Sequence, residues 1–315
     1  MEIQTEKHRR AVIDVGSNSV KLLVADCANG TITPVHHSGE QTRLGHGVFS
    51  SGQLQAEAIA KTAHAVTVFA QRARTQGAES IRVLATSAAR EAANGEALII
   101  AVREASGLEL EIIPAQKEAA LVLAGARSTP GLGSSAFSVV DVGGGSTEVL
   151  VADGAQVFFQ DSFPLGTVRW LEQTTLSDPL TTEDWQRTRQ SIEGFVTQHI
   201  APRLVPALAA AGGVSSLVGA GGTPVFLLRV LVGRGDLSFS ELDHGRLSRE
   251  QVESVTARLW SLPLAARQRL PGLPANRADV ILFGAAIFWV LMRQFGFTEL
   301  RPTLRGVRFG ALLAD

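Results

Sequence analysis

SVVDVGGGSTEVLVAD, residues 138–153, decides the fold of this chain, because a close copy of it occurs earlier in the sequence. The copy, AVIDVGSNSVKLLVAD at residues 11–26, aligns without a gap at a constant offset of 127 residues, Asp141 against Asp14. The match includes the central turn and both flanking apolar runs. The sequence therefore predicts an internal duplication, in which two similar half-molecules face each other.

Each copy has the layout of a β-hairpin with a ligand-binding turn. An apolar run ends in Asp, a turn of small residues follows, and a second apolar run leads away. Glycine lets the backbone approach a ligand closely, and successive N–H groups in such a turn form an anion-binding concavity. Further donors are the hydroxyls of Ser17, Ser19, Ser146 and Thr147. The Asp that ends each first strand suits a hard cation, directly or through water.

Length and composition limit the class of protein. The chain has 315 residues, enough for two domains, and its hydrophobic content of 45% is typical of a globular protein. A formal net charge of −1 gives no general basic field for nucleic acid or a membrane surface. A single cysteine, Cys27, excludes an internal disulfide and favours a reducing compartment. The polar N-terminus MEIQTEKHRR lacks a signal-peptide core, so we expect a soluble, cytoplasmic protein.

Strands alternate with helices in both halves, which predicts α/β domains with mostly parallel sheets. Helices are expected over residues 53–76, 94–105, 181–200 and 202–211. The apolar run at 280–292 is too short to cross a bilayer and is expected to be a buried helix, and residues 233–246 a surface loop. The linker-like segment 127–136 predicts a hinge between domains at 1–127 and 128–315. A terminal helix at about 306–315 is expected to pack back on the first domain.

A third glycine turn, VGAGGT at residues 218–223, ends a predicted strand and begins a helix, where an anion is favoured. Two hairpins and such a turn are the arrangement of actin-like phosphotransferases. The fold class predicted is therefore α/β, with two actin-like (ribonuclease H-like) domains and an interdomain cleft that holds the ligand.

The whole set of motifs resembles the exopolyphosphatase/guanosine pentaphosphate phosphohydrolase family. The resemblance rests on the two hairpins and on LATSAAREAANG, the KEA of QKEAALVLAG, FPLGTVRW, LVGAGGTP, LPANRADVILFG and LRGVRFGALL. These motifs extend from residue 11 to residue 314, so the likeness covers essentially the whole chain. It matches the short two-domain form, because the additional C-terminal helical domain of longer relatives does not follow.

The resemblance implies a role for individual residues. Glu118 takes the place of the catalytic base that activates water, and Arg90 that of an arginine that contacts phosphate. The implied metal-organising acids are Asp141 and Glu148, with Asp14 as a partner, and the implied cofactor is Mg²⁺ or another divalent cation. Where relatives have two consecutive acids, this chain has Lys117 before Glu118, and we expect the lysine to alter the environment of Glu118.

Three glycine turns are predicted to bind phosphate, and their residues are Gly16, Ser17, Asn18, Ser19, Gly143, Gly144, Gly145, Ser146, Thr147, Gly221, Gly222 and Thr223. The implied reaction is hydrolysis of a terminal phosphoanhydride bond. Inorganic polyphosphate is the first substrate expected, and guanosine pentaphosphate (pppGpp) is the alternative. An actin-like kinase and a non-catalytic sensor of an alarmone or polyphosphate remain open as other classes. A homodimer is also implied, with neither nucleic acid nor a membrane as partner.

Overall fold

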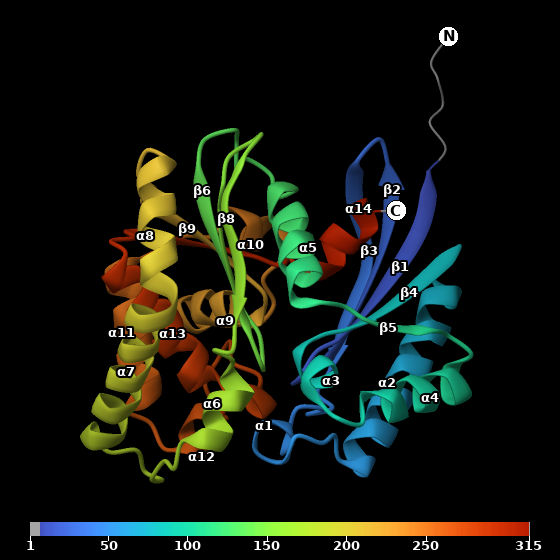
Figure 1. Cartoon of the computed structure of the whole chain (residues 1–315), viewed down its shortest axis with the longest axis horizontal. Coiled ribbons are helices and arrows are strands. Elements are labelled where there is room, and N and C mark those ends of the chain that lie inside the picture. Colours follow the sequence, from blue (N-terminus) through green and yellow to red (C-terminus); the bar gives the residue numbers. More distant parts are fainter. Residues whose placement is uncertain (1–6, 315) are drawn as a thin grey trace. The chain divides into compact units, whose positions relative to one another are not determined.

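The structure, a computed structural model, describes residues 7–314, which divide into two compact units (Figure 1). Unit 1 contains the described residues up to Ser128 and those from Arg305, and unit 2 contains Thr129–Leu304. The sequence predicts bounds at 127/128, with the terminal helix returning to the first domain. That helix, α14 (Val307–Leu313), packs against α5 (Ala115–Arg127) and β1 (His8–Val15) of unit 1. Residues 1–6, part of the polar N-terminus noted above, lie outside the described residues.

Unit 1 is built on a mixed sheet of strand order β3-β2-β1-β4-β5. Its strands are β1, β2 (Val20–Ala28), β3 (Thr31–Glu40), β4 (Ser80–Ala85) and β5 (Leu110–Ile112). β1, β2 and β3 form antiparallel pairs, whereas β4 lies parallel to β1 and β5 parallel to β4. The first predicted hairpin is thus β1–β2, in the middle of the sheet.

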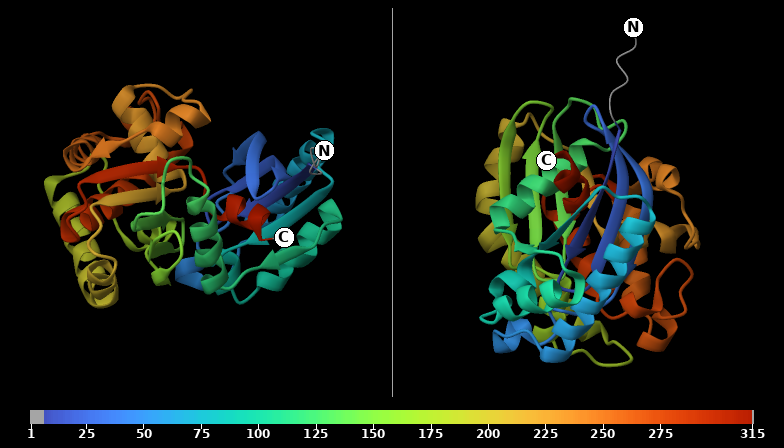
Figure 2. Two further views of the ribbon diagram at one scale, coloured as in Figure 1. Left: turned by 90° about the horizontal axis from the view of Figure 1, so that it is seen from above. Right: turned by 90° about the vertical axis from the view of Figure 1, so that its right-hand side faces the viewer.

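The helices of unit 1 are α1 (Val48–Ser51), α2 (Ala56–Thr75), α3 (Ser87–Glu91), α4 (Gly95–Ser106), α5 and α14. α2 packs on α4, and their apolar faces form one core with side chains such as Ile13 and Val24 of the sheet. α5 and α14 lie side by side (Figure 2). Glycine permits this approach, since a Cβ on Gly310 would lie 1.9 Å from the carbonyl oxygen of Leu121.

Unit 2 is built on a mixed sheet of strand order β10-β11-β9-β6-β7-β8. Its strands are β6 (Phe137–Val142), β7 (Thr147–Ala152), β8 (Val157–Phe163), β9 (Ser216–Ala220), β10 (Leu247–Ser248) and β11 (Glu299–Thr303). β6, β7 and β8 pair antiparallel, and β6, β9 and β11 pair in parallel. The second predicted hairpin is β6–β7, again in the middle of its sheet.

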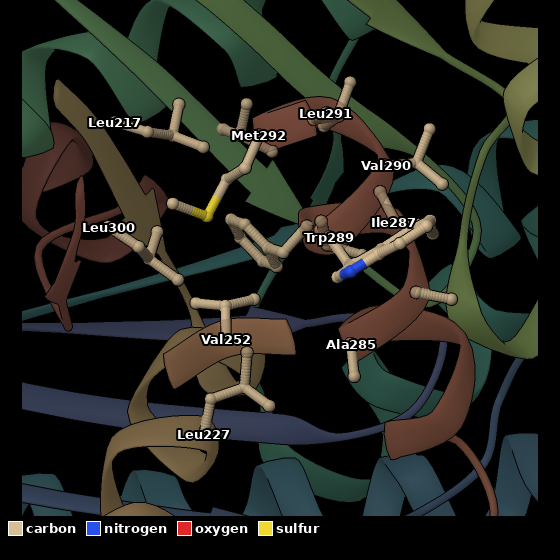
Figure 3. Close-up of a cluster of buried hydrophobic side chains, with 14 of the residues drawn as sticks. Leu217, Leu227, Val252, Ala285, Ile287, Trp289, Val290, Leu291, Met292 and Leu300 are labelled. Atoms are coloured by element: carbon tan, nitrogen blue, oxygen red, sulfur yellow. The ribbon is translucent and has the colours of Figure 1, made fainter. Parts of the chain in front are cut away.

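The helices of unit 2 are α6 (Thr167–Gln173), α7 (Thr182–Phe195), the π-helix η1 (Val196–Ile200), α8 (Ala201–Ala210), α9 (Gly222–Val232), α10 (Phe239–His244), α11 (Arg249–Trp260), α12 (Leu264–Arg267), the 3₁₀ helix η2 (Ala275–Arg277) and α13 (Ile281–Gln294). α13 is buried from Ile281 to Met292, as the apolar run at 280–292 predicts. Figure 3 shows its side chains among Leu217 and Leu300 of the sheet and Val252 of α11.

The two sheets share one topology. If β10 is set aside, unit 2 reads β8-β7-β6-β9-β11, which is the unit 1 order with the same antiparallel and parallel pairs. The hairpin turns also close alike, because Gly16 N donates to Ser19 O at 3.0 Å and Gly143 N to Ser146 O at 2.9 Å. The predicted fold class, α/β with two actin-like domains, is confirmed.

Two segments that the sequence predicts to be irregular, residues 233–246 and 127–136, are partly ordered in the structure. The surface loop predicted at 233–246 is wrong in part, because Ser238 caps the short helix α10 through a reciprocal capping box with Glu241. Residues 128–136 contain neither helix nor strand. The start of this segment is nevertheless fixed within unit 2, since the buried Arg301 donates to the carbonyl oxygens of Pro130 and Gly131.

No helix within residues 7–314 combines the length and the apolar character needed to cross a bilayer.

Acid pH is expected to weaken unit 1 through Asp26. Arg9 contacts both Asp26 carboxylate oxygens, at 2.8 and 3.2 Å, and together with Lys7 holds the pKa of Asp26 below its ordinary value. Because the pKa of Asp26 is lower in the folded than in the unfolded protein, its carboxylate stabilises the fold at pH values above the unfolded pKa of about 3.9. This stability is lost as the pH falls through the folded pKa. The substitution Asp26→Asn should therefore lower the free energy of unfolding at pH 7 by about 1 kcal/mol, a figure reduced for the partly exposed Arg9.

Urea unfolding of both proteins at pH 7 and pH 3 measures this effect of Asp26. The difference in the free energy of unfolding between the wild type and Asp26→Asn should be smaller at pH 3 than at pH 7. A difference that stays constant with pH would contradict the assignment to the ion pair.

Candidate active site

The turn of the β1–β2 hairpin, loop 1 (residues 16–19), is held from two sides. Gly45 N donates to Ser17 O at 2.6 Å, and Ala88 N at the start of α3 donates to the Ser17 hydroxyl at 3.2 Å. Asn18 accepts from the Gln41 side chain through Oδ1, but its buried Nδ2 has no hydrogen-bond partner within the described residues. An amide donor left unpaired at 7% exposure is costly unless a ligand accepts from it.

The predicted catalytic residues Arg90 and Glu118 lie together. Arg90 is in α3 and Glu118 in the first turn of α5, where its side chain is 8% exposed. Arg90 Nη1 donates to Glu118 Oε2 at 2.8 Å and to the carbonyl oxygen of Ile113 at 3.0 Å. The guanidinium therefore orients the Glu118 carboxylate, and an ionised carboxylate is the form that accepts a proton from water.

Lys117 does not pair with Glu118. Its Nζ lies 2.5 Å from Glu111 Oε1, and Arg82 binds Glu111 Oε2 at 2.9 Å. This pairing, with Lys117 as the first cause, lowers the pKa of Glu111. The charge of Lys117 is thus paired with Glu111 at the surface, and Glu118 is in contact with the guanidinium of Arg90.

Asp14 differs from the other two predicted metal ligands. Across the hairpin its partner is Lys21, and burial raises the pKa of the Asp14 carboxyl against the opposing effects of Lys21 and Arg308. Arg308 of α14 also donates to the carbonyl oxygen of Leu22 at 3.0 Å. Asp14 belongs to unit 1 and the other two acids to unit 2, so its part in a metal site stays a prediction.

The turn of the β6–β7 hairpin together with the first residue of β7, called loop 2 (residues 143–147), is braced by α6. Thr167 N donates to Gly143 O at 3.0 Å, Val168 N to Gly144 O at 2.8 Å, and Arg169 Nε to Gly145 O at 2.8 Å. A Cβ on Gly166 would lie 2.3 Å from Gly144 O, so only glycine allows this contact. With these carbonyls engaged by α6, loop 2 has a fixed backbone.

Asp141 and Glu148 occupy directly opposed positions of β6 and β7. A pair of acids at such positions is unfavourable by itself. Glu148 is 2% exposed, and its Oε1 accepts from Ser146 Oγ at 2.9 Å and Ser162 Oγ at 2.7 Å. Mg²⁺ typically binds one or two carboxylates and completes its coordination with water and phosphate. The two acids therefore fit a divalent cation, although residues 7–314 contain no group of three or more His, Cys, Asp or Glu side chains placed to hold a metal.

The hydroxyls of loop 2 are used inside the protein. Thr147 is fully buried and donates to the carbonyl oxygen of Leu165, and Ser146 donates to Glu148. The Thr147 hydroxyl, which the sequence predicts as a further donor to the ligand, thus makes a bracing contact within unit 2. Phosphate binding by loop 2 would rest on its backbone N–H groups.

The third glycine turn lies beside Asp141. Gly221 has φ +87° and precedes α9, and a Cβ there would lie 2.6 Å from Asp141 Oδ1. Gly222 and Thr223 form the first turn of α9, where backbone N–H groups favour an anion. The structure therefore brings loop 2, Asp141, Glu148 and the Gly221 turn together in unit 2, and loop 1, Arg90 and Glu118 in unit 1.

Comparison with known proteins shows the family to which a chain with this arrangement of residues belongs. The profile of the Ppx/GppA phosphatase family matches residues 23–315. The chain belongs to this family. It is 32% identical over 297 residues to exopolyphosphatase 2 of Mycobacterium tuberculosis. The aligned region covers 91% of this chain and 90% of that relative. It is 29% identical to the guanosine-5'-triphosphate,3'-diphosphate pyrophosphatase of Photobacterium profundum, over 94% of the chain and 56% of that relative.

A solved structure gives the same result. The Ppx/GppA family member from Aquifex aeolicus is 28% identical and superposes with a TM-score of 0.78, over 98% of this chain and 97% of that one. Members of the Ppx/GppA family are phosphoanhydride hydrolases, and this chain is an enzyme of that class.

Sequence reasoning on this Ppx/GppA protein missed Ser162, which contacts Glu148. A serine in a strand carries no signal by itself. Once β7 and β8 are paired, however, Ser162 lies opposite Glu148 and its hydroxyl reaches the carboxylate. The register of β8 is therefore the signal that would have found it.

Proposed function

We propose that the chain is a Mg²⁺-dependent exopolyphosphatase, which removes the terminal phosphate of inorganic polyphosphate. The pair of the half-buried Arg90 and the buried Glu118, in the unit that carries loop 1, supports this proposal most strongly, because it supplies an oriented carboxylate for the activation of water. The likeness to an exopolyphosphatase over 91% of the chain supports the choice of substrate.

The reaction follows from the roles of these residues. Loop 1 and loop 2 bind phosphate groups through backbone N–H groups, and Asn18 Nδ2 adds a donor. Glu118 accepts a proton as the water oxygen attacks the terminal phosphorus, and the bond from that phosphorus to the bridging oxygen breaks. The products are orthophosphate and a chain shorter by one phosphate. Asp141 and Glu148 would hold Mg²⁺, which supplies charge neutralisation at the phosphoryl oxygens when bound. Such catalysis is mainly positioning and electrostatics.

Phosphate release from medium-chain polyphosphate, measured with and without Mg²⁺, tests the proposal. Release that requires the cation is expected. ATP-dependent phosphorylation of an added acceptor would instead favour a kinase, and tight polyphosphate binding without release would favour a sensor. Hydrolysis of pppGpp is the second candidate function, which the likeness to a guanosine-5'-triphosphate,3'-diphosphate pyrophosphatase favours.

The substitution Ser162→Ala should weaken cation binding. It removes one of the two hydroxyls that hold Glu148 Oε1, and loss of such an outer contact typically costs about 10- to 100-fold in metal affinity or activity. We expect the Mg²⁺ concentration for half-maximal activity to rise about 10-fold, with weaker Mn²⁺ binding by electron paramagnetic resonance. Ser138→Ala is the matched control, because the buried Ser138 hydroxyl of β6 has no partner within the described residues. Equal effects of both substitutions would refute the role of Ser162.

We also propose a cytoplasmic location and a homodimer. The single cysteine supports the location, and the family resemblance supports the dimer. Light scattering tests the dimer, and a monomer at every concentration would contradict it.

A further inference from the structure

Three of the four tryptophans of the chain line one cavity in the helical part of unit 2. They are Trp185 of α7, Trp260 of α11 and Trp289 of α13 (Figure 3), and the volume of this tryptophan cavity is about 290 Å³. Such a volume is near the lower end of the range for sites that bind small molecules. The candidate active site described above uses none of the residues that line it.

The three indole rings form one continuous aromatic wall. Trp185 is in the middle, with its ring centroid 5.1 Å from that of Trp260 and 5.4 Å from that of Trp289. Its ring plane is inclined by 52° to Trp260 and by 68° to Trp289. Rings inclined in this way do not cover each other's faces as a parallel stack would. Because Trp185 is only half-buried, part of this wall is open to a ligand.

The aromatic wall has an affinity for positive charge. The guanidinium carbon of Arg293 lies 4.8 Å from the ring centroid of Trp289, a distance at which the negative face of an indole attracts a cation. Trp260 Nε1 donates to the carbonyl oxygen of Leu282 at 3.3 Å, so the polar group of this indole is used inside the protein. What Trp260 offers to a ligand is therefore its ring.

The rest of the lining adds one negative charge at an open rim. Among the described residues that line the cavity, Glu253 is the only ionisable one, and the others are apolar, threonine or serine. The rim is exposed at Glu253, Ala257 and Ser261, so the cavity is accessible from solvent. A carboxylate beside indole faces disfavours phosphate and favours a cation. Alkyl groups on that cation would contact the rings, as in the aromatic sites that recognise quaternary ammonium ligands.

We propose that the tryptophan cavity is a binding site for a small organic cation with a quaternary or alkylated ammonium group. Trp185 contacts the alkyl groups, and Glu253 is the counter-charge. The site is separate from the phosphate chemistry, so it stands or falls independently of the proposed function.

Calorimetric titration of the full chain with choline tests the proposal. The comparison ligand is the neutral isostere of choline, in which carbon replaces the ammonium nitrogen. The two probes have the same shape, so a difference in affinity measures the contribution of the charge. We expect choline to bind about 10-fold more tightly than the isostere. Equal affinities for the two probes, or no binding of choline to the wild type, would reject the site.

Trp185→Leu and Trp170→Leu locate the binding. Both tryptophans are half-buried in helices of unit 2, but Trp170 of α6 does not line the tryptophan cavity. Trp185→Leu should lower the affinity for choline about 10-fold, and Trp170→Leu should leave it unchanged. Similar losses in the two variants would place the binding elsewhere and overturn the proposal.

Glu253→Gln tests the counter-charge and keeps the proposal testable if Trp185→Leu does not fold, because Glu253 is exposed. It should weaken choline binding about 3- to 10-fold without weakening binding of the neutral isostere. Glu250→Gln is the matched control, since Glu250 is exposed in the same helix and does not line the cavity. Equal effects of the two substitutions on choline binding would refute the role of Glu253.

Discussion

Replacement of Glu118 by Gln is expected to lower kcat for phosphate release by about 10²- to 10⁴-fold, the usual contribution of a general base. Glutamine keeps the shape of the side chain and an oxygen that can accept from Arg90 Nη1, but it cannot take a proton from water. Neither phosphate-binding loop includes Glu118, so polyphosphate binding should persist. Initial rates and equilibrium binding of polyphosphate measure the two effects separately.

Lys117→Gln is the matched control for Glu118→Gln. The two residues are neighbours at the start of α5, but Lys117 is paired with Glu111 and lies 43% exposed. We expect nearly wild-type turnover from the control. Near-normal turnover in Glu118→Gln, or a similar loss in both variants, would contradict the assignment of Glu118 as the base.

Replacement of Gly166 by Ala is expected to disrupt loop 2. The new Cβ would lie 2.3 Å from Gly144 O and from the carbonyl carbon of Gly145, and both are backbone atoms that cannot turn away. Overpacking of this kind typically costs about 1–3 kcal/mol of stability. A shift of about 1 Å at a catalytic site can cost about 10²-fold in rate, so kcat/KM should fall on that order. Thermal unfolding and initial rates measure the two losses.

Gly194→Ala is the control for the change from glycine to alanine. Gly194 lies in α7, and within the described residues no atom other than its chain neighbours and the nearby backbone of its own helix is within 4 Å of a Cβ built there. Alanine should stabilise this helix by about 0.5–1 kcal/mol and leave activity unchanged. If Gly166→Ala retained wild-type activity and stability, the bracing of loop 2 by α6 would be wrong.

The duplicated hairpin is sufficient to predict the fold, because its sequence pattern predicts the strands of each hairpin and its repetition predicts two similar domains. The alternation of apolar runs with a small-residue turn predicts paired strands, and the 127-residue offset predicts two equivalent sheets. The structure has both, down to the same turn-closing hydrogen bond from Gly16 to Ser19 and from Gly143 to Ser146. The pairing of the strands in each hairpin could therefore be inferred without coordinates, whereas the register of β8, and with it the contact of Ser162 with Glu148, was not predicted.

Side-chain partners could not be predicted in the same way. Lys117 is next to Glu118 in sequence, but consecutive residues of a helix point in different directions, and Lys117 instead reaches Glu111 of β5. Thr147 follows Ser146 in the turn, but it is the first residue of β7 and points into the protein toward Leu165. Such choices depend on which element packs alongside, and the local sequence does not contain that information.

The helical half of unit 2 shows the same limit. Residues 174–181 connect α6 and α7 without forming a helix or a strand, and no periodic pattern encodes the path of such a segment. α10 was missed because the segment 233–246 is rich in polar residues, although its Ser238 and Glu241 form a capping box at the spacing typical of a helix start. The capping spacing was the available signal.

The most direct test of phosphoanhydride hydrolysis is the fate of the water oxygen. Polyphosphate is incubated with the wild-type protein and Mg²⁺ in water enriched in oxygen-18, and the released orthophosphate is analysed by mass spectrometry. Attack of water on the terminal phosphorus predicts one oxygen-18 in each orthophosphate released. Orthophosphate without the label, or no release at all, would contradict the central claim that this chain is a phosphoanhydride hydrolase acting through activated water.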